Sequence, residues 1–378
     1  MLSGGGVRGA YEAGAVKGIT EILELKSSDA CPFQIFTGTS VGAINATYLA
    51  ACAEQGDMAI DGLIETWCAL KVSDYIQLDI LRGLRAKRKQ RDNGNSLIDA
   101  NPLAQLIEHK IPFDRLHLNR REGIVKSLVV AALDIAKGKT TMFAQISDDW
   151  TFRPSHDPFR NALLTNIELE HVLASAALPF IFPLRKIGKR FYCDGGLRHN
   201  TPITPAIRSN ANKIVIIPAL RSPKGKREET NSDTYPNLTF VAGKLLNALL
   251  ADPLEKDLAI VNRFNRLVEV LDSALTPEER KRVNEVFLDT RGHEYRLLDT
   301  LTIRPSRDIG VLAGNRIKEG VGGTMGWFLK QVLKRTGSDE ADWASYVLFD
   351  GEFAKHVIEM GKQDAWEMRD QIKQFFVS

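Results

Sequence analysis

The sequence predicts an α/β protein with three layers, α/β/α, a mainly parallel central sheet and a helical C-terminal region. Short and almost continuously apolar runs at residues 128–135 and 214–217 are typical of strands covered on both faces. Segments with helical periodicity separate these runs, and such alternation places helices on both faces of one sheet. A chain of 378 residues is long enough to bury a sizeable core of this kind.

The expected elements follow one another along the whole chain. Strands are expected at 33–36, 128–135, 140–146, 214–217 and 301–303. Helices are expected at 41–54, 59–70, 101–110, 167–176, 202–209, 238–251 and 253–270. In the last third, two further helical faces are expected, formed by Phe353, Val357 and Met360 and by Met368, Ile372 and Phe375.

The clearest loop, at residues 221–235, suggests how the chain is organised. We expect a catalytic core at 1–220 and a mostly helical C-terminal part at 221–378 that packs on the core and completes it. A loop within a single domain is the alternative.

Composition is that of an ordinary globular protein, with 44% hydrophobic and 26% charged residues and a formal net charge of +3. The four cysteines lack paired spacing, which disfavours a disulfide framework or a zinc site. No charged segment followed by an apolar one opens the chain, and no apolar run is long enough to span a membrane. A cytoplasmic protein is expected.

A G-x-S-x-G pentapeptide, Gly38-Thr39-Ser40-Val41-Gly42, lies between the expected strand at 33–36 and the helix after it. A strand that turns sharply into a helix holds its central residue in a strained conformation and exposes its side chain, while the glycines avoid clashes. Ser40 is therefore a candidate nucleophile at a helix N-terminus. The alternative is a glycine-bracketed turn in which Ser40 only caps the helix.

A second glycine cluster, Gly4-Gly5-Gly6-Val7-Arg8-Gly9, opens a helix whose apolar face includes Val16, Ile19 and Leu23. Unhindered backbone N–H groups of such a loop can bind a phosphate or an oxyanion. A dinucleotide site would also need a second strand that ends in an acidic residue to bind the ribose. No such strand follows the loop, which disfavours a dinucleotide site. With Ser40 available, an oxyanion hole is the preferred interpretation.

Asp194 is the candidate base. It ends an aromatic strand and precedes Gly195 and Gly196, whereas none of the seven histidines lies in a triad-like context. An ordinary carboxylate is a weak base, so Asp194 would need burial and direct contact with the hydroxyl. A simple Asp-Gly turn is the alternative.

These motifs, together with the Ala-Ser-Ala-Ala-Leu-Pro block at 174–179, resemble the patatin-like phospholipases in order and spacing. The resemblance implies lipid acyl hydrolysis by a Ser–Asp dyad without histidine, metal or cofactor. It implies Ser40 as nucleophile, Asp194 as base, and the amides of residues 4–9 as oxyanion donors. The family's first strand normally precedes the glycine loop by several apolar residues, whereas only three residues precede Gly4 here, so either the start is trimmed or the first strand is frayed.

The resemblance implies a phospholipid or lysophospholipid substrate. A soluble carboxylesterase or an acyltransferase could use the same dyad, and a nucleotide-binding regulatory protein could use the glycine loop. Six basic residues crowd positions 82–91, which indicates either a solvated face or a patch for anionic membrane surfaces. No nucleic-acid-binding module is recognisable.

Overall fold

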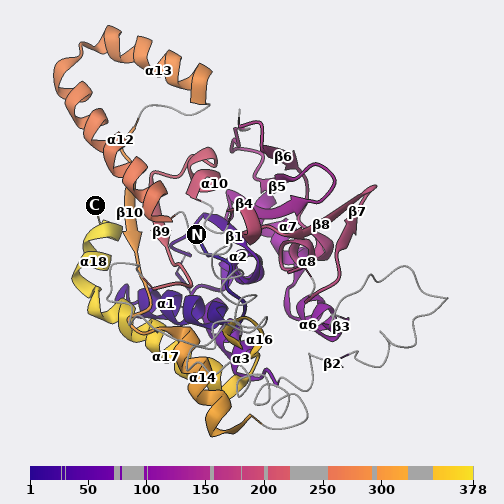
Figure 1. Ribbon diagram of the computed structural model, residues 1–378. Coiled ribbons are helices and arrows are strands. Elements are labelled where there is room, and N and C mark those ends of the chain that lie inside the picture. Colours follow the sequence, from indigo (N-terminus) through magenta and orange to yellow (C-terminus); the bar gives the residue numbers. More distant parts are fainter. Residues whose placement is uncertain are drawn as a thin grey trace, which may run out of the picture.

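A computed structural model of the chain (Figure 1) describes residues 1–26, 28–29, 31–71, 77–78, 98–99, 101–153, 157–179, 181–199, 203–221, 254–291, 296–321 and 344–377. Three features expected from the sequence lie outside these residues: the basic run at 82–91, the helix at 238–251, and the loop at 221–235 except for its first residue.

The main sheet has six strands: β1 (Ile35–Thr39), β4 (Ser127–Asp134), β5 (Lys139–Ile146), β6 (Arg160–Leu164), β7 (Arg185–Ile187) and β8 (Arg190–Asp194). Their order is β6-β5-β4-β8-β7. β1 pairs with the first part of β4, and β8 pairs with the last part. Two smaller sheets are formed by β9 (Lys213–Ile216) with β10 (Asp299–Thr302) and by β2 (Gln77–Leu78) with β3 (Ile98–Asp99).

Leu2 takes the place of a first strand. It forms parallel bridges to Gly38 on one side and to Ile217 on the other. Met1 adds to this link, because its ammonium donates to the Val215 carbonyl oxygen at 2.9 Å and its carbonyl oxygen accepts the Ile217 N–H at 3.1 Å. The first two residues therefore join the main sheet to the β9–β10 sheet by a few backbone hydrogen bonds.

The α/β class is confirmed, but the sheet is mixed where a mainly parallel one was expected. β1–β4, β5–β6 and β9–β10 are parallel, whereas β4 runs antiparallel to both β5 and β8. The reason is the short turn between β4 and β5, in which Gly138 has φ +60°, because so short a connection joins only antiparallel strands. An apolar run reports burial on both faces and does not reveal strand direction.

The described helices cover both sides of the sheets: α1 (Gly9–Ile22), α2 (Val41–Ala51), α3 (Met58–Cys68), α6 (Asn101–Lys110), α7 (Phe113–Arg121), α8 (Leu169–Ser175), α9 (Gly196–His199), α10 (Ile203–Arg208), α12 (Leu254–Ala274), α13 (Pro277–Arg291), α14 (Ile309–Gly320), α16 (Ala344–Val347), α17 (Gly351–Glu367) and α18 (Arg369–Val377). The six expected helices within the described residues coincide with α2, α3, α6, α8, α10 and α12. The sequence reasoning missed α7, which buries little besides Leu116 and so shows no apolar stripe.

The C-terminal region packs directly on the N-terminal helix, and α1 and α17 lie side by side (Figure 1). Glycines on both helices allow this approach: a Cβ on Gly14 would lie 1.9 Å from the Ile358 carbonyl oxygen, and one on Gly361 would lie 2.3 Å from that of Tyr11. The Tyr11 hydroxyl donates to Asp364 Oδ2 at 2.9 Å. The face formed by Phe353, Val357 and Met360 is buried, as expected.

Among the described residues, no helix combines the length and the apolar character that crossing a membrane requires.

Candidate active site

Ser40 occupies a sharp turn between β1 and α2. Its φ of 55° and ψ of −131° lie in a region that residues with a side chain rarely adopt, at a cost of about 1–3 kcal/mol. The turn is packed so closely that its glycines are required. A Cβ on Gly38 would lie 2.2 Å from the Gly42 carbonyl oxygen, and one on Gly42 would lie 2.4 Å from that of Ser3. Thr39 and Val41, the other residues of the pentapeptide, are buried.

The structure brings Ser40 and Asp194 into direct contact where the ends of β1 and β8 meet beside β4, since Thr39 pairs with Ala131 and Asp194 with Ala132. The Ser40 hydroxyl donates to Asp194 Oδ2 at 2.5 Å, and Asp194 Oδ1 accepts the Gly196 N–H at 2.7 Å. Asp194 ends β8, and the Cβ of any residue replacing Gly195 would lie 2.3 Å from the Ala131 carbonyl oxygen. The two residues that sequence reasoning paired are therefore joined without any side chain between them.

Burial gives Asp194 the properties of a base at neutral pH. The residue is 1% exposed, and this burial raises the pKa of its carboxyl from 3.8 to about 7, although hydrogen bonds from Ser40 and Gly196 act to lower it. A general base works best when its pKa lies near the operating pH.

Ser175 holds the backbone of Ser40, the candidate nucleophile, and was given no role in the sequence analysis. Its hydroxyl accepts the Ser40 backbone N–H at 2.9 Å and donates to the Ala131 carbonyl oxygen at 2.6 Å. Ser175 belongs to the block at 174–179, which also holds the Asp194 N–H through the Ala177 carbonyl oxygen at 2.9 Å. In the sequence, the only sign of a role for Ser175 was that it belongs to this block.

The glycine loop reaches the same site with only part of its length. Gly5 and Gly6 line the pocket beside Ser40 and Asp194, whereas Val7 and Arg8 turn away into a 3₁₀ helix at Gly6–Arg8 and Gly9 begins α1. Arg8 is buried; its Nε donates to Ser345 Oγ at 2.8 Å, and its guanidinium lies 4.7 Å from the centre of the Tyr346 ring. Gly4 leads into the loop and is buried.

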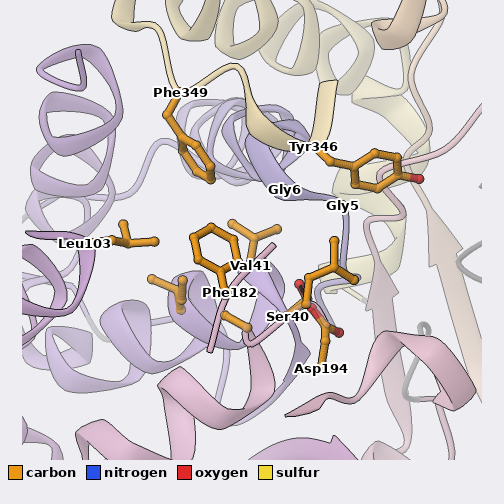
Figure 2. Close-up of a pocket in the computed structure, with 12 residues that line it drawn as sticks. Gly5, Gly6, Ser40, Val41, Leu103, Phe182, Asp194, Tyr346 and Phe349 are labelled. Atoms are coloured by element: carbon orange, nitrogen blue, oxygen red, sulfur yellow. Dashed lines mark hydrogen bonds between the residues drawn. The ribbon is translucent and has the colours of Figure 1, made fainter. Parts of the chain in front are cut away.

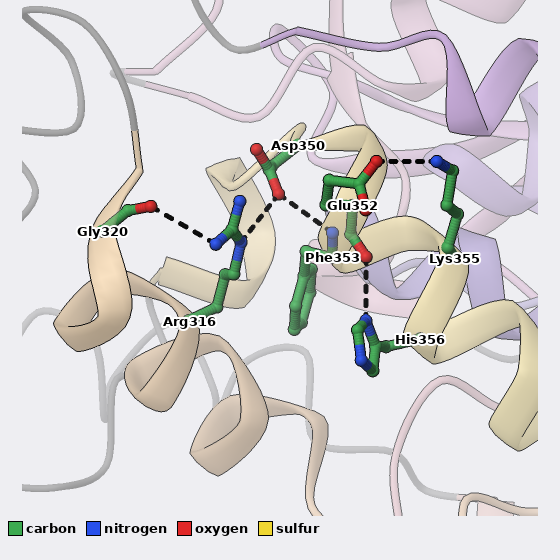
Figure 3. Close-up of polar contacts among 7 residues, drawn as sticks. All are labelled: Arg316, Gly320, Asp350, Glu352, Phe353, Lys355 and His356. Atoms are coloured by element: carbon green, nitrogen blue, oxygen red, sulfur yellow. Dashed lines mark hydrogen bonds and ion pairs between the residues drawn. The ribbon is translucent and has the colours of Figure 1, made fainter.

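The C-terminal region closes the other side of the loop. Gly6 has φ +60°, and a Cβ there would lie 2.2 Å from the Tyr346 carbonyl oxygen. Phe349 stacks on Trp67, with ring centres 6.3 Å apart. Asp350, which caps α17 by accepting the Phe353 N–H, also pairs with Arg316 of α14 at 3.0 Å and so fixes the end of this segment (Figure 3).

The pocket formed in this way is narrow and mostly apolar. Its lining residues are Gly5, Gly6, Ser40, Val41, Ile44, Leu103, Ala176, Leu178, Phe182, Asp194, Tyr346 and Phe349. Ser40 and Asp194 lie at one end, and Phe182, Leu103 and Phe349 extend toward the other (Figure 2). The cavity volume is about 40 Å³, small beside the 300–1,000 Å³ typical of ligand pockets, so an extended ligand requires these side chains to move.

The pocket brings together the Ser40 hydroxyl, the Asp194 carboxylate and two residues of the glycine loop, Gly5 and Gly6. Among the described residues, no group of three or more His, Cys, Asp or Glu side chains is placed to hold a metal ion. The side chain of His199 lies outside the described set.

A family model described as patatin-like phospholipase matches residues 1–207. Among solved structures, the chain is similar to VipD from Legionella pneumophila, with a TM-score of 0.36 and 12% sequence identity. That alignment covers 98% of this chain and 66% of VipD, so this chain spans about two thirds of its neighbour's length. Comparison with curated proteins found no match. The assignment to a family rests on residues 1–207, which contain both Ser40 and Asp194.

Proposed function

The chain belongs to the patatin-like phospholipase family, and we propose that it is a serine lipid acyl hydrolase that cleaves phospholipids or lysophospholipids through Ser40 and Asp194. The observation that carries this proposal is the 2.5 Å hydrogen bond from the Ser40 hydroxyl to the buried Asp194 carboxylate. Family membership supports acyl ester hydrolysis in general, and the dyad and its substrate are the parts that we add.

In the proposed reaction, Asp194 Oδ2 accepts the hydroxyl proton while Ser40 Oγ attacks the ester carbonyl carbon. The tetrahedral intermediate collapses as Asp194 returns the proton to the departing alcohol, which leaves an acyl ester on Ser40. Water then attacks this ester, gives its proton to Asp194, and the fatty acid is released as Ser40 regains its proton. The carboxylate acts as base and acid in turn.

The amides of Gly5 and Gly6 are the proposed oxyanion donors. The Ser40 N–H is already committed to Ser175, so the nucleophile's own amide is not available for this purpose. Gly5 and Gly6 line the pocket next to Ser40, and the loop is held by close packing against Tyr346. Donors fixed in this way need no reorganisation as negative charge develops.

The lining of the pocket supports a fatty acyl substrate over a nucleotide. Val41, Leu103, Phe182 and Phe349 offer apolar contacts to an acyl chain. A phosphate at the glycine loop would face the Asp194 carboxylate, while the nearby Arg8 side chain is turned toward Ser345. This arrangement disfavours the nucleotide-binding alternative.

A fluorophosphonate probe tests the proposal directly, because it labels an activated serine. We expect wild-type protein to be labelled on Ser40, as mapped by mass spectrometry of the modified peptide. Ser40→Ala should lose the label, and the matched variant Ser273→Ala on α12 should keep it. Labelling elsewhere, or none, would contradict the assignment.

Product analysis separates hydrolysis from acyl transfer. With a lysophospholipid substrate in ¹⁸O-labelled water, a hydrolase gives free fatty acid that carries the isotope. Formation of a diacyl product from a second lysolipid would instead indicate an acyltransferase with the same dyad.

A further inference from the structure

The β7–β8 hairpin, whose last residue is Asp194, carries an exposed surface. Lys186 of β7 pairs with Phe191 of β8, so their side chains lie on the same face, and the Lys186 ammonium is 6.0 Å from the Phe191 ring centre. Ile135 adjoins them, because its N–H donates to the Phe191 carbonyl oxygen at 3.1 Å. Tyr192 points to the opposite face and packs on Phe143.

Several large apolar side chains of this face are exposed. Ile135 is 45% exposed, Phe191 49% and the preceding Leu184 42%. Phe159, 56% exposed, extends the surface: it lies under the Arg198 guanidinium, which also donates to the Gly138 carbonyl oxygen. We call the surface formed by Ile135, Lys137, Phe159, Leu184, Lys186, Lys189, Phe191 and Arg198 the hairpin face.

The charge of the hairpin face is positive. Lys137, Lys186, Lys189 and Arg198 are exposed, and none of them forms an ion pair with another residue of the described chain. The neighbouring acids are already neutralised, since Asp134 pairs with Arg190 at 2.8 Å, Asp157 with Arg160 at 3.1 Å and Glu170 with Arg185 at 3.8 Å.

We propose that the hairpin face docks the protein on an anionic lipid bilayer. Basic groups suit the headgroup charge, and aromatic and aliphatic side chains between them suit the boundary with the hydrocarbon. One continuous segment joins this face to the site, because Phe182 lines the pocket, residues 185–194 form the hairpin, and Asp194 ends it. A docked bilayer would therefore contact the segment that forms the pocket wall.

A nucleic acid is the other polyanion that such a surface could attract. The Phe159 and Phe191 rings suit either partner, and Ile135 and Leu184 favour lipid, because aliphatic side chains insert into a bilayer but add nothing to base stacking. This proposal rests on the proposed function only for the choice of lipid as occupant, and its test measures binding separately from catalysis.

The test compares binding of the full chain to phosphatidylcholine vesicles with and without phosphatidylserine. We expect wild type to bind the anionic vesicles and to dissociate as salt is raised. Lys186→Glu combined with Lys189→Glu should weaken binding roughly thirtyfold or more, and Phe191→Ser should weaken it in a manner that low salt does not restore. The control is Lys281→Glu combined with Arg282→Glu, two exposed cations on α13, which should bind as wild type does.

Catalysis distinguishes this proposal from the proposed function. The hairpin variants should keep labelling of Ser40 and turnover of a soluble short-chain ester, while hydrolysis of vesicle lipid falls. Unchanged vesicle binding in both hairpin variants would overturn the docking surface. The docking surface would also be overturned if an RNA oligonucleotide displaced the bound vesicles and if binding of that RNA depended on Lys186 and Lys189.

The basic run at 82–91 provides an independent arm. Charge reversal at Arg85, Lys87, Arg88 and Lys89 tests the membrane patch predicted from the sequence. If this reversal removed all vesicle binding while the hairpin variants bound normally, the docking surface would belong to that run.

Discussion

The two walls of the pocket are built on different principles. The dyad wall, formed by Ser40 and Asp194 with Ser175 behind Ser40, is held by part-buried hydrogen bonds and by backbone contacts that only glycine permits. The C-terminal wall, formed by Tyr346 and Phe349, packs its Tyr346 backbone against the glycine loop and its Phe349 ring against Trp67. The dyad wall depends on the exact positions of its polar atoms, whereas the C-terminal wall depends on the size and shape of its side chains.

This difference has a consequence for specificity. The family match ends at residue 207 and includes the dyad wall but not Tyr346 or Phe349. The family match therefore covers the residues of the proposed chemistry, and we predict that the C-terminal wall, outside the match, influences substrate preference. We therefore expect substitutions in the dyad wall to abolish ester hydrolysis, and substitutions in the C-terminal wall to change its rate or its substrate preference.

The largest effect is expected from Ser40→Ala. Loss of the nucleophile should reduce ester turnover on the order of a millionfold, as measured with a soluble chromogenic ester. The fold should persist, because Ala fits the same turn, and circular dichroism and thermal unfolding check this. Ser40→Gly should be equally inactive but more stable than Ser40→Ala, since glycine relieves the strain of φ 55°. Wild-type turnover in Ser40→Ala would show that the nucleophile lies elsewhere.

Asp194→Asn should follow, with a loss of roughly ten-thousandfold. The amide keeps the shape and can still accept the Gly196 N–H, but it cannot take up the serine proton. The wild-type rate should fall as pH decreases through about 7, because protonated Asp194 is no base, and this acid limb should vanish in the variant. His199→Ala should cost far less, and an equal loss would indicate a histidine-containing triad.

Thermal unfolding adds a second readout for Asp194. Its pKa is raised on folding, so the folded state binds the proton more tightly than the unfolded chain does. The resulting stability is present at low pH and is lost as pH rises from about 4 to about 7. Asp194→Asn removes the buried charge, and its stability relative to wild type should therefore increase over that range.

The comparison also explains how far sequence reasoning reached. The dyad wall requires glycine at three positions, Gly38, Gly42 and Gly195, because a Cβ at each would clash with backbone atoms. These required glycines form motifs that can be recognised in the sequence. Ser175 lay inside a recognised block, but its hydrogen bonds join residues far apart in the chain. Phe349 needs only to be large and apolar, and no local pattern marks such a residue as part of a site. The domain boundary at 220 and a cytoplasmic location remain predictions.

A smaller effect is expected where the two walls meet. Ser345→Ala removes the hydroxyl that accepts from Arg8 Nε at 2.8 Å, which loosens the segment packed on Gly6. If Gly5 and Gly6 hold the oxyanion, kcat should fall about tenfold with less change in KM, and fluorophosphonate labelling should slow in parallel. Ser345→Thr should restore the rate, because it keeps the hydroxyl, and Ser273→Ala is the surface control. A change in KM alone would assign this contact to substrate binding.

The smallest effect, Phe349→Leu, tests whether the C-terminal wall chooses the acyl chain. Leucine keeps the position apolar but removes the stack on Trp67 and enlarges a cavity of only about 40 Å³. The ratio of kcat/KM for a long-chain ester to that for a short-chain ester should rise by up to about tenfold, because a methylene of pocket space is worth about 1 kcal/mol at the lower limit and about 1.4 kcal/mol corresponds to tenfold. Phe376→Leu, in the C-terminal cluster beside Phe33, provides the matched control and should leave that ratio unchanged. If Phe349→Leu left the ratio as in wild type, the acyl chain would not contact the C-terminal wall. The assignment of substrate preference to that wall would then be wrong.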